Sequence, residues 1–250
     1  MAQMIVAGNW KMNSNKEGVT SLLQGLKQGE LAVKNAHLIV FPPFPYLAIA
    51  QQELAGTSIS IGVQNVCAAA KGAFTGEVSL TMVKEFGASY VLVGHSERRG
   101  LFAEDNAQVA AKYIATQKAS LTPILCVGET LEQRENGHTL SVVLEQIKAV
   151  IDEAGGASFA NAVVAYEPVW AIGTGLTASP QQAQEVHQAI RAYVAEFAPK
   201  QAQELKILYG GSVTAASAKE LFAQADIDGG LVGGASLEAD SFLAIGQAAK

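Results

Sequence analysis

The sequence predicts an α/β protein folded as a single closed (β/α)8 barrel over residues 1–250. Eight short apolar runs recur along the chain with helical segments between them, and no linker, low-complexity tract or shift in composition divides it. Eight β/α units in about 250 residues favour a closed barrel. An open doubly wound sheet is the competing architecture. It is weakened because no GxGxxG motif follows the first predicted strand.

The predicted strands are short, and most are continuous in apolar residues, as expected of parallel strands buried on both faces. They are Met4–Ala7, His37–Phe41, Ser58–Ile61, Tyr90–Val93, Thr122–Val127, Ala162–Tyr166, Lys206–Tyr209 and Gly230–Val232. Their regular recurrence is what sets the number of β/α units at eight.

Helices are predicted between the strands. Apolar residues at helical spacing indicate helices over Asp105–Lys118 and Leu131–Glu153. A third helix, over Gln181–Phe197, has the clearest start signal, because Ser179 is a favourable N-cap and Gln182 lies three residues later, as in a capping box.

Charge and composition narrow the class of function. The net charge of −6 argues against nucleic acid or an anionic membrane as a partner. No apolar run approaches the ~20 residues needed to span a bilayer, and the first residues lack the pattern of a signal peptide. Cys67 and Cys126 form no CxxC pair or disulfide framework, which favours a reducing compartment. We therefore expect a cytoplasmic protein.

Polar side chains follow the first and fourth predicted strands, where a barrel carries its catalytic groups. Asn9 and Lys11 are two residues apart, so in an extended chain both face the barrel mouth. His95 begins a helical turn, whose N-terminus lowers an imidazole pKa and favours the neutral ring. Arg98 is expected to pair with a carboxylate, for which Glu77 is a candidate. Taken singly, each residue is also compatible with a structural role.

Glu167 stands at the end of the sixth predicted strand. A carboxylate buried there must be paired, protonated or functional, because burying it alone is costly. Pro168 biases Glu167 toward extended geometry. The segment 169–178 then has a stiff start, two glycines and a capped helix at its end, as expected of a lid. An ordinary long connection is the alternative interpretation.

Glycine pairs follow the last two predicted strands, at Gly210-Gly211 before Ser212 and at Gly233-Gly234. Glycine lets backbone N–H groups approach an anion closely, and barrel enzymes commonly bind phosphate with the loops after strands seven and eight. Together with Gly173 in the predicted lid, these pairs predict a phosphate site. The four histidines show no HxH or HExxH spacing, so we expect no metal site.

Five blocks of the sequence resemble the signature blocks of the triosephosphate isomerase family, in order from the first strand to the last. They are AGNWKMN at 7–13, GHSERR at 94–99, AYEPVWAIGTG at 165–175, YGGSV at 209–213 and LVGGASL at 231–237. The resemblance implies the TIM barrel, the fold named after this family. It also implies interconversion of dihydroxyacetone phosphate and D-glyceraldehyde 3-phosphate through an enediol(ate), in glycolysis and gluconeogenesis, without a cofactor.

The same resemblance implies a role for each site residue. Glu167 is the base and His95 the electrophile that polarises the substrate carbonyl. Lys11 and Asn9 contact the substrate and stabilise the enediolate, with Glu97 as a supporting carboxylate near Lys11. The implied phosphate-binding positions are Gly173, Ser212, Gly233 and Gly234.

The family is typically a homodimer, and the segment 64–77 resembles its projecting loop, with Thr75 near the partner's site and Phe74 as an interface anchor. Three positions depart from the family pattern. Leu176 stands where the lid usually has Lys, Ala103 stands where Gly is usual, and Gly230 is smaller than expected within a strand.

Two other functions compete with the isomerase. A Schiff-base aldolase needs a buried lysine at an inner strand position, but Lys206 lies at the amino end of its strand and Lys11 at the mouth. A non-catalytic metabolite-binding protein derived from an isomerase rests only on the rule that fold does not fix function.

Overall fold

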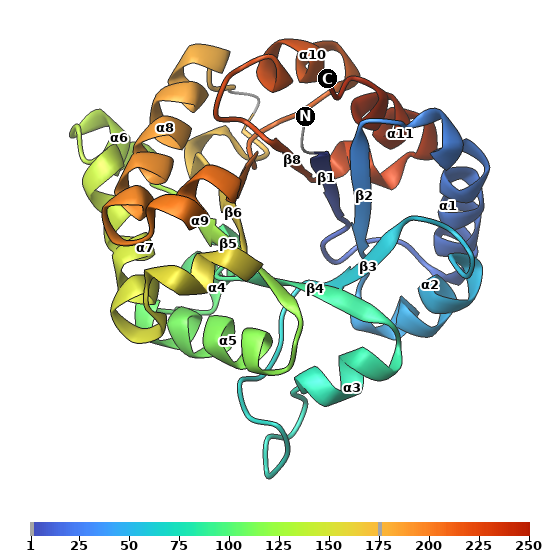
Figure 1. The fold of residues 1–250 in the computed structure, drawn as a ribbon. Helices are drawn as coiled ribbons and strands as arrows, with labels where there is room; N and C mark the ends of the chain where they lie inside the picture. Colours follow the sequence, from blue (N-terminus) through green and yellow to red (C-terminus); the bar gives the residue numbers. More distant parts are fainter. Residues whose placement is uncertain (1–2, 175–176) are drawn as a thin grey trace.

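The computed structural model describes residues 3–174 and 177–250 and contains eight parallel strands closed into one barrel (Figure 1). The strands are β1 Met4–Asn9, β2 Ala36–Phe41, β3 Ser60–Val63, β4 Ala88–Val93, β5 Thr122–Val127, β6 Val163–Tyr166, β7 Lys206–Tyr209 and β8 Gly229–Val232. Each strand pairs with the next along the chain, and β8 pairs with β1. The predicted closed (β/α)8 barrel is confirmed, and the open doubly wound sheet is excluded.

Helices surround the barrel on its outside (Figure 1). They are α1 Lys16–Gly29, α2 Leu47–Glu53, α3 Leu80–Glu85, α4 Ser96–Leu101, α5 Asn106–Lys118, α6 Leu131–Glu135, α7 Thr139–Ala154, α8 Pro180–Phe197, α9 Pro199–Glu204, α10 Ala215–Phe222 and α11 Ala239–Gln247. Short 3-10 turns are η1 Glu30–Ala32, η2 Phe44–Tyr46, η3 Gly156–Asn161, η4 Val169–Ala171 and η5 Gly234–Leu237. Across the described ranges, no helix is long and apolar enough to span a membrane.

Two apolar layers hold the barrel together. The inner layer fills the barrel with side chains from alternate strand positions, such as Ile39, Ile124 and Leu208. The outer layer packs the other strand face against the helices and contains Trp10, which is fully buried. Because both faces of each strand are covered, the strands read as continuous apolar runs.

The predicted start of α8 is confirmed in detail. Ser179 caps the helix by accepting a hydrogen bond from the backbone N–H of Gln182, and the Gln182 side chain bonds back to the cap. Asp105, predicted as the first residue of a helix, is instead the N-cap of α5. These caps satisfy N–H groups that would otherwise have no partner within the helix.

The bounds of several predicted elements were wrong: the first strand runs on to Asn9, and the fourth begins at Ala88 and not at Tyr90. The helix expected over Leu131–Glu153 is two helices, α6 and α7, because Gly137 takes a left-handed φ of 73° between them. The third strand begins two residues later than the expected Ser58–Ile61 and runs on through Gly62. Gly62 pairs with Tyr90 of β4, and glycine stands there because a Cβ would lie 2.2 Å from the Phe41 ring, which fills that space.

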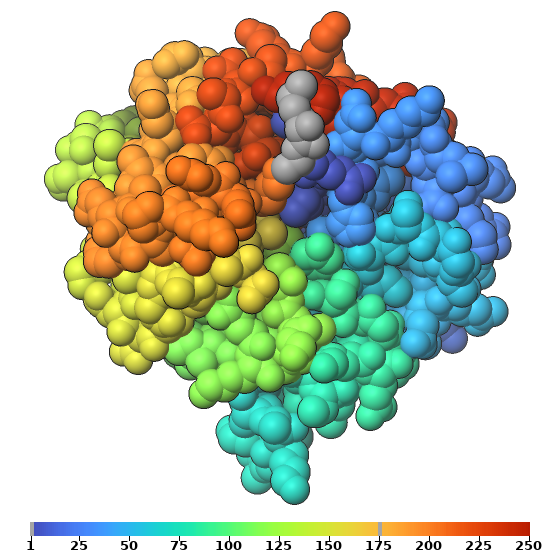
Figure 2. All heavy atoms as spheres, in the orientation of Figure 1, coloured from blue at the N-terminus to red at the C-terminus, as the bar shows by residue number. Residues whose placement is uncertain are grey.

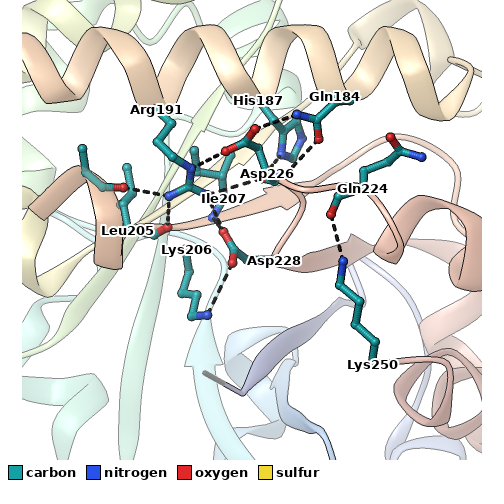
Figure 3. A network of polar contacts seen from close by, with 11 residues as sticks. Gln184, His187, Arg191, Leu205, Lys206, Ile207, Gln224, Asp226, Asp228 and Lys250 are labelled. Carbon is teal, nitrogen blue, oxygen red and sulfur yellow. Dashed lines mark hydrogen bonds and ion pairs between the residues drawn. The ribbon is translucent and has the colours of Figure 1, made fainter. Parts of the chain in front are cut away.

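A polar network joins α8 to residues at the amino ends of β7 and β8 (Figure 3). Arg191 donates to Asp226 from Nε at 2.6 Å and to Asp228 from a terminal nitrogen at 2.8 Å. The buried ring of His187 lies in the same network, with Nδ1 3.1 Å from the carbonyl oxygen of Asp226. This network fixes the helix that follows the predicted lid.

The segment 64–77, between β3 and α3, projects away from the body of the molecule, as both views show (Figures 1 and 2). Phe74 lies in this projection with about half of its surface exposed. The exposed aromatic is a feature that the fold alone does not require.

Candidate active site

A cavity of about 520 Å³ opens where the strands end. It is lined by residues from the ends of β1, β4, β6, β7 and β8, and these include every predicted site residue except Glu97. The predicted residues in its wall are Asn9, Lys11, His95, Glu167, Gly173, Ser212, Gly233 and Gly234. Residues distant in sequence therefore meet at one mouth, as expected of a barrel.

Asn9 and Lys11 both reach the cavity, but by a different backbone route from the one predicted. Lys11 is not extended; it takes a left-handed φ of 53°. Its N–H donates to Asn9 Oδ1 at 3.0 Å, and its carbonyl accepts from Gln64 Nε2 at 2.8 Å. Gln64 also donates to the carbonyl of Phe41 at 2.8 Å. The sequence prediction missed Gln64, whose one signal was its place after the third strand.

Glu97 lies beside the cavity and forms an ion pair with Lys11, Nζ to Oε1 2.5 Å. It comes from the first turn of α4, directly after His95. The pair keeps the Lys11 ammonium at the cavity edge. The predicted proximity of Glu97 to Lys11 is present in this geometry.

Glu167 is only 2% exposed and is paired with groups at the start of α4. Its Oε1 lies 2.9 Å from His95 Nε2, and its Oε2 accepts the Ser96 N–H at 2.9 Å. His95 Nδ1 accepts the Glu97 N–H at 3.2 Å. Because Nδ1 is an acceptor, this network puts the proton on Nε2, which donates to Glu167.

The two partners shift each other's pKa. Burial raises the pKa of Glu167, but the charge and hydrogen bond of His95 and the Ser96 N–H lower it by more, so the net pKa is lowered. Burial lowers the pKa of His95, yet the adjacent Glu167 carboxylate raises it by more. The expectation of a lowered His95 pKa was therefore wrong for this arrangement, because the ring is paired with the Glu167 carboxylate.

The glycines at the far side of the cavity border open space. A Cβ at Gly173 or Gly234 would meet no atom within 4 Å, and one at Gly233 would meet only the Lys11 stem at 3.7 Å. Backbone at these positions is accessible to a ligand because no side chain stands in front of it. The mouth thus holds a carboxylate, an imidazole and an ammonium on one side and exposed backbone on the other.

Comparison with known proteins identifies the family of the chain. The triosephosphate isomerase family model matches residues 4–249. The chain is 58% identical to the triosephosphate isomerase of Thiobacillus denitrificans, over 100% of this chain and 99% of the relative. It is 56% identical to that of Alcanivorax borkumensis over 98% of both chains. The chain belongs to the triosephosphate isomerase family. A third relative, the triosephosphate isomerase of Psychromonas ingrahamii, is 53% identical over both full lengths.

Side-chain contacts hold the start of the segment predicted to be a lid. Trp170 in η4 donates from Nε1 to Glu129 Oε1 at 2.9 Å, and the Arg134 guanidinium lies 4.5 Å from its ring centre. Ser212, predicted to hold phosphate, donates its hydroxyl to the Ala171 carbonyl at 3.1 Å. The predicted departure at Leu176 lies outside the described residues.

Glu129 is a buried carboxylate that holds Trp170 and that the sequence prediction missed. It is fully buried after β5 and accepts from the Tyr166 hydroxyl at 3.1 Å as well as from Trp170. A carboxylate two residues after a strand was the available signal, close to the one that identified Glu167.

The predicted partner of Arg98 was wrong. Arg98 Nε lies 2.5 Å from Glu104 Oε1, and Lys112 also contacts this carboxylate. Glu77 lies in the projecting segment, whereas Glu104 follows α4 directly. Ala103 turns the chain back with a left-handed φ of 53°, which brings Glu104 under Arg98. A left-handed φ favours glycine, which agrees with the expectation that Gly is usual at position 103.

Proposed function

We propose that Glu167, His95, Lys11 and Asn9 catalyse the isomerisation, with Glu97 in support. Family membership assigns the reaction itself: the chain is an intramolecular oxidoreductase that interconverts dihydroxyacetone phosphate and D-glyceraldehyde 3-phosphate in glycolysis and gluconeogenesis. We treat residues 1–250 as one catalytic domain. The observation that carries the residue assignment is the meeting of the Glu167 carboxylate, the His95 ring and the Lys11 ammonium at one cavity.

Glu167 acts as the base. In the present arrangement its carboxylate is held by His95 and the Ser96 N–H, away from bulk water. A lowered pKa keeps it ionised at neutral pH, so it is ready to accept a proton from the carbon next to the substrate carbonyl. Turning to the substrate exchanges two hydrogen bonds for contact with the acidic C–H.

His95 acts as the electrophile. Its Nδ1 is fixed by the Glu97 N–H, so Nε2 carries the proton that the substrate oxygen needs. The Glu167 carboxylate raises the His95 pKa, and this effect is lost when Glu167 turns to the substrate. Burial still lowers the His95 pKa. The ring then donates as a neutral imidazole.

Lys11 and Asn9 hold the negative charge that develops on the enediolate. The ammonium is placed by its ion pair with Glu97 and by the strained backbone at Lys11, which Asn9 and Gln64 brace. A preorganised positive charge stabilises the transition state without reorganising during the reaction.

The phosphate binds where backbone is exposed, at Gly173, Gly233 and Gly234, with Ser212. Ser212 would exchange its bond to the Ala171 carbonyl for the phosphate, which couples phosphate binding to the start of the lid. Binding energy from the phosphate is remote from the reacting carbons and is available to close the lid over them. Closure protects the enediolate from water.

The isomerase acts as a homodimer through the 64–77 segment. A second cavity, of about 550 Å³, borders the first at Asn9, Lys11 and His95 and is lined by Met12, Phe44, Leu101 and Phe102. Met12 is 95% exposed in the single chain, and Leu101 and Phe102 are also exposed. The projecting segment of a second copy, with Phe74 at its exposed tip and Thr75 next to it, would fill this apolar cavity.

We place the isomerase in the cytoplasm. Cys67 and Cys126 are both free thiols, as expected in a reducing compartment. The triose phosphates that it converts are intermediates of glycolysis, which supports the same location.

A coupled assay of both triose phosphates with the purified protein tests the function. We expect turnover without added metal or cofactor, and loss of nearly all kcat in Glu167→Gln. Binding of the substrate without turnover in the unaltered protein would favour the metabolite-binding alternative. A covalent adduct trapped by borohydride would favour the aldolase.

A further inference from the structure

One arginine of the four stands apart from the others. Arg98, Arg134 and Arg191 each pair with a carboxylate. Arg99 is partly buried, and within residues 3–174 and 177–250 it forms no ion pair with Asp or Glu. A guanidinium drawn away from water without a counter-charge is costly, so its contacts must be accounted for.

The Arg99 guanidinium donates hydrogen bonds to neutral acceptors around the His95 turn. Its Nε donates to the Gly94 carbonyl at 2.8 Å, one terminal nitrogen donates to Asn106 Oδ1 at 2.8 Å, and the other donates to the Cys126 carbonyl at 3.3 Å. One side chain thereby joins the residue before His95 to β5 and to the first residue of α5. The planar fork of arginine suits this three-way contact, which an ammonium does not reproduce.

The backbone at this turn has little stiffness of its own. Gly94 takes a left-handed φ of 71°, and α4 after it spans six residues. A Cβ at Gly94 would lie 3.0 Å from the Arg99 guanidinium, which packs directly on the turn. The next two residues are His95, proposed as the electrophile, and Ser96, whose N–H holds the Glu167 carboxylate.

We propose that Arg99 is a positioning residue that fixes the Gly94-His95-Ser96 turn, and through it the places of the His95 ring and the resting base. This inference rests on the proposed role of His95. Arg99 itself lies outside the wall of the substrate cavity, so its loss lowers kcat by misplacing His95 and leaves substrate binding nearly unchanged.

A separate cavity of about 310 Å³ makes a sharp test available. It lies behind Glu167, is lined by Arg99, and is bordered by exposed Gly100 and Thr130. In Arg99→Ala this cavity would admit a guanidinium ion to the place of the missing group. We expect Arg99→Ala to lose about 100-fold in kcat, the effect of misplacing a catalytic group by about 1 Å. KM should change by less than about threefold.

Guanidinium chloride at concentrations well below denaturation should restore part of this kcat, and urea, its neutral analogue of similar shape, should not. Asn106→Ala is the matched control, because it removes one acceptor of Arg99 but leaves the two carbonyl contacts; its kcat should stay within about threefold of the unaltered enzyme. Arg99→Lys should fall between the unaltered enzyme and Arg99→Ala. If Arg99→Ala does not fold, Arg99→Lys carries the test.

Near-normal kcat in a folded Arg99→Ala would overturn the inference, and so would a loss confined to KM. An equal loss of kcat in Asn106→Ala would also overturn the inference, since the effect would then come from the contact between Arg99 and α5. Failure of the proposed function looks different: the unaltered enzyme would then show no turnover at all.

Discussion

Both carboxylate oxygens of Glu167 are engaged in a buried site, one by His95 and one by the Ser96 N–H. Glu167→Asp shortens the side chain by one methylene and withdraws the base from the reacting carbon. We expect kcat to fall by about 100-fold or more, with a much smaller change in KM. Steady-state kinetics measure this, with exposed Glu153→Asp as the control. Unchanged turnover in Glu167→Asp would defeat the assignment of the base.

His187 gives the protein a pH-dependent stability. Burial lowers the pKa of His187 to about 4, whereas a histidine in the unfolded chain titrates near 6.5. Between these values the unfolded state binds a proton that the folded state does not. Stability therefore falls as pH decreases through this window, by at most about 1.4 kcal/mol per pH unit from this group.

His187→Gln removes this titration. We expect the free energy of unfolding of the unaltered protein to decrease from pH 7 to pH 5 more steeply than that of His187→Gln. Urea unfolding at one fixed protein concentration measures both, because assembly contributes to apparent stability. Parallel pH profiles in the two proteins would show that His187 is not the responsible group.

Residues next to strand ends were predictable, because a strand's carboxyl end fixes where the following side chain lies. Asn9, His95 and Glu167 were placed in this way. Gln64 and Glu129 were missed, although each also follows a strand. Their roles depend on contacts with Lys11 and Trp170, which lie far away in sequence. Local spacing does not encode such partners.

At the scale of elements, β8 contains two adjacent glycines, of which one has no space for a side chain and the other has. Gly229 has a φ of 137°, and a Cβ there would lie 1.8 Å from the carbonyl oxygen of Ile5. At Gly230 a Cβ would make ordinary contacts of 3.5 Å with the Phe222 ring and 3.6 Å with the Tyr209 carbonyl. Glycine is thus required at the first position and only tolerated at the second, where it costs conformational entropy on folding.

Gly230→Ala should stabilise the protein by about 0.5 to 1 kcal/mol, because it restricts the unfolded chain and fills space against Phe222. Gly229→Ala, the matched control one residue away, should destabilise it by about 2 kcal/mol or more. Thermal and urea unfolding measure both. Destabilisation by Gly230→Ala would mean that the glycine at position 230 is required, contrary to this account.

The elements themselves were predicted where the apolar pattern is continuous, as in β5 and β7, whose bounds match the prediction. Two of the errors fell at glycines. Gly137 ends one helix through a left-handed backbone, and Gly62 stays in a strand because Phe41 fills the place of its side chain. Glycine thus ends one element and lies within another, and the sequence near each glycine does not show which of the two applies.

For the whole molecule, the closed barrel could be predicted from the number of strands in the sequence. The exposed apolar surface beside the site could not, because its residues come together only in the folded chain. Met12 follows β1, Leu101 ends α4 and Phe44 begins η2, yet they line one cavity beside the substrate site. Both cavities share Lys11 and His95. If this apolar surface stayed exposed, water would therefore also reach these two side chains. Assembly and catalysis are therefore expected to fail together.

Phe74→Asp places a charge at the exposed tip of the projecting segment and should produce a monomer at micromolar concentration. We expect at least a tenfold loss of kcat, about 1.4 kcal/mol, from the uncovered second cavity. Leu31→Asp is the control, since Leu31 is 85% exposed but lies in η1, outside the proposed interface. Sedimentation and steady-state kinetics test both variants. A fully active monomer would separate catalysis from assembly, and a dimeric Phe74→Asp would move the interface elsewhere on the barrel.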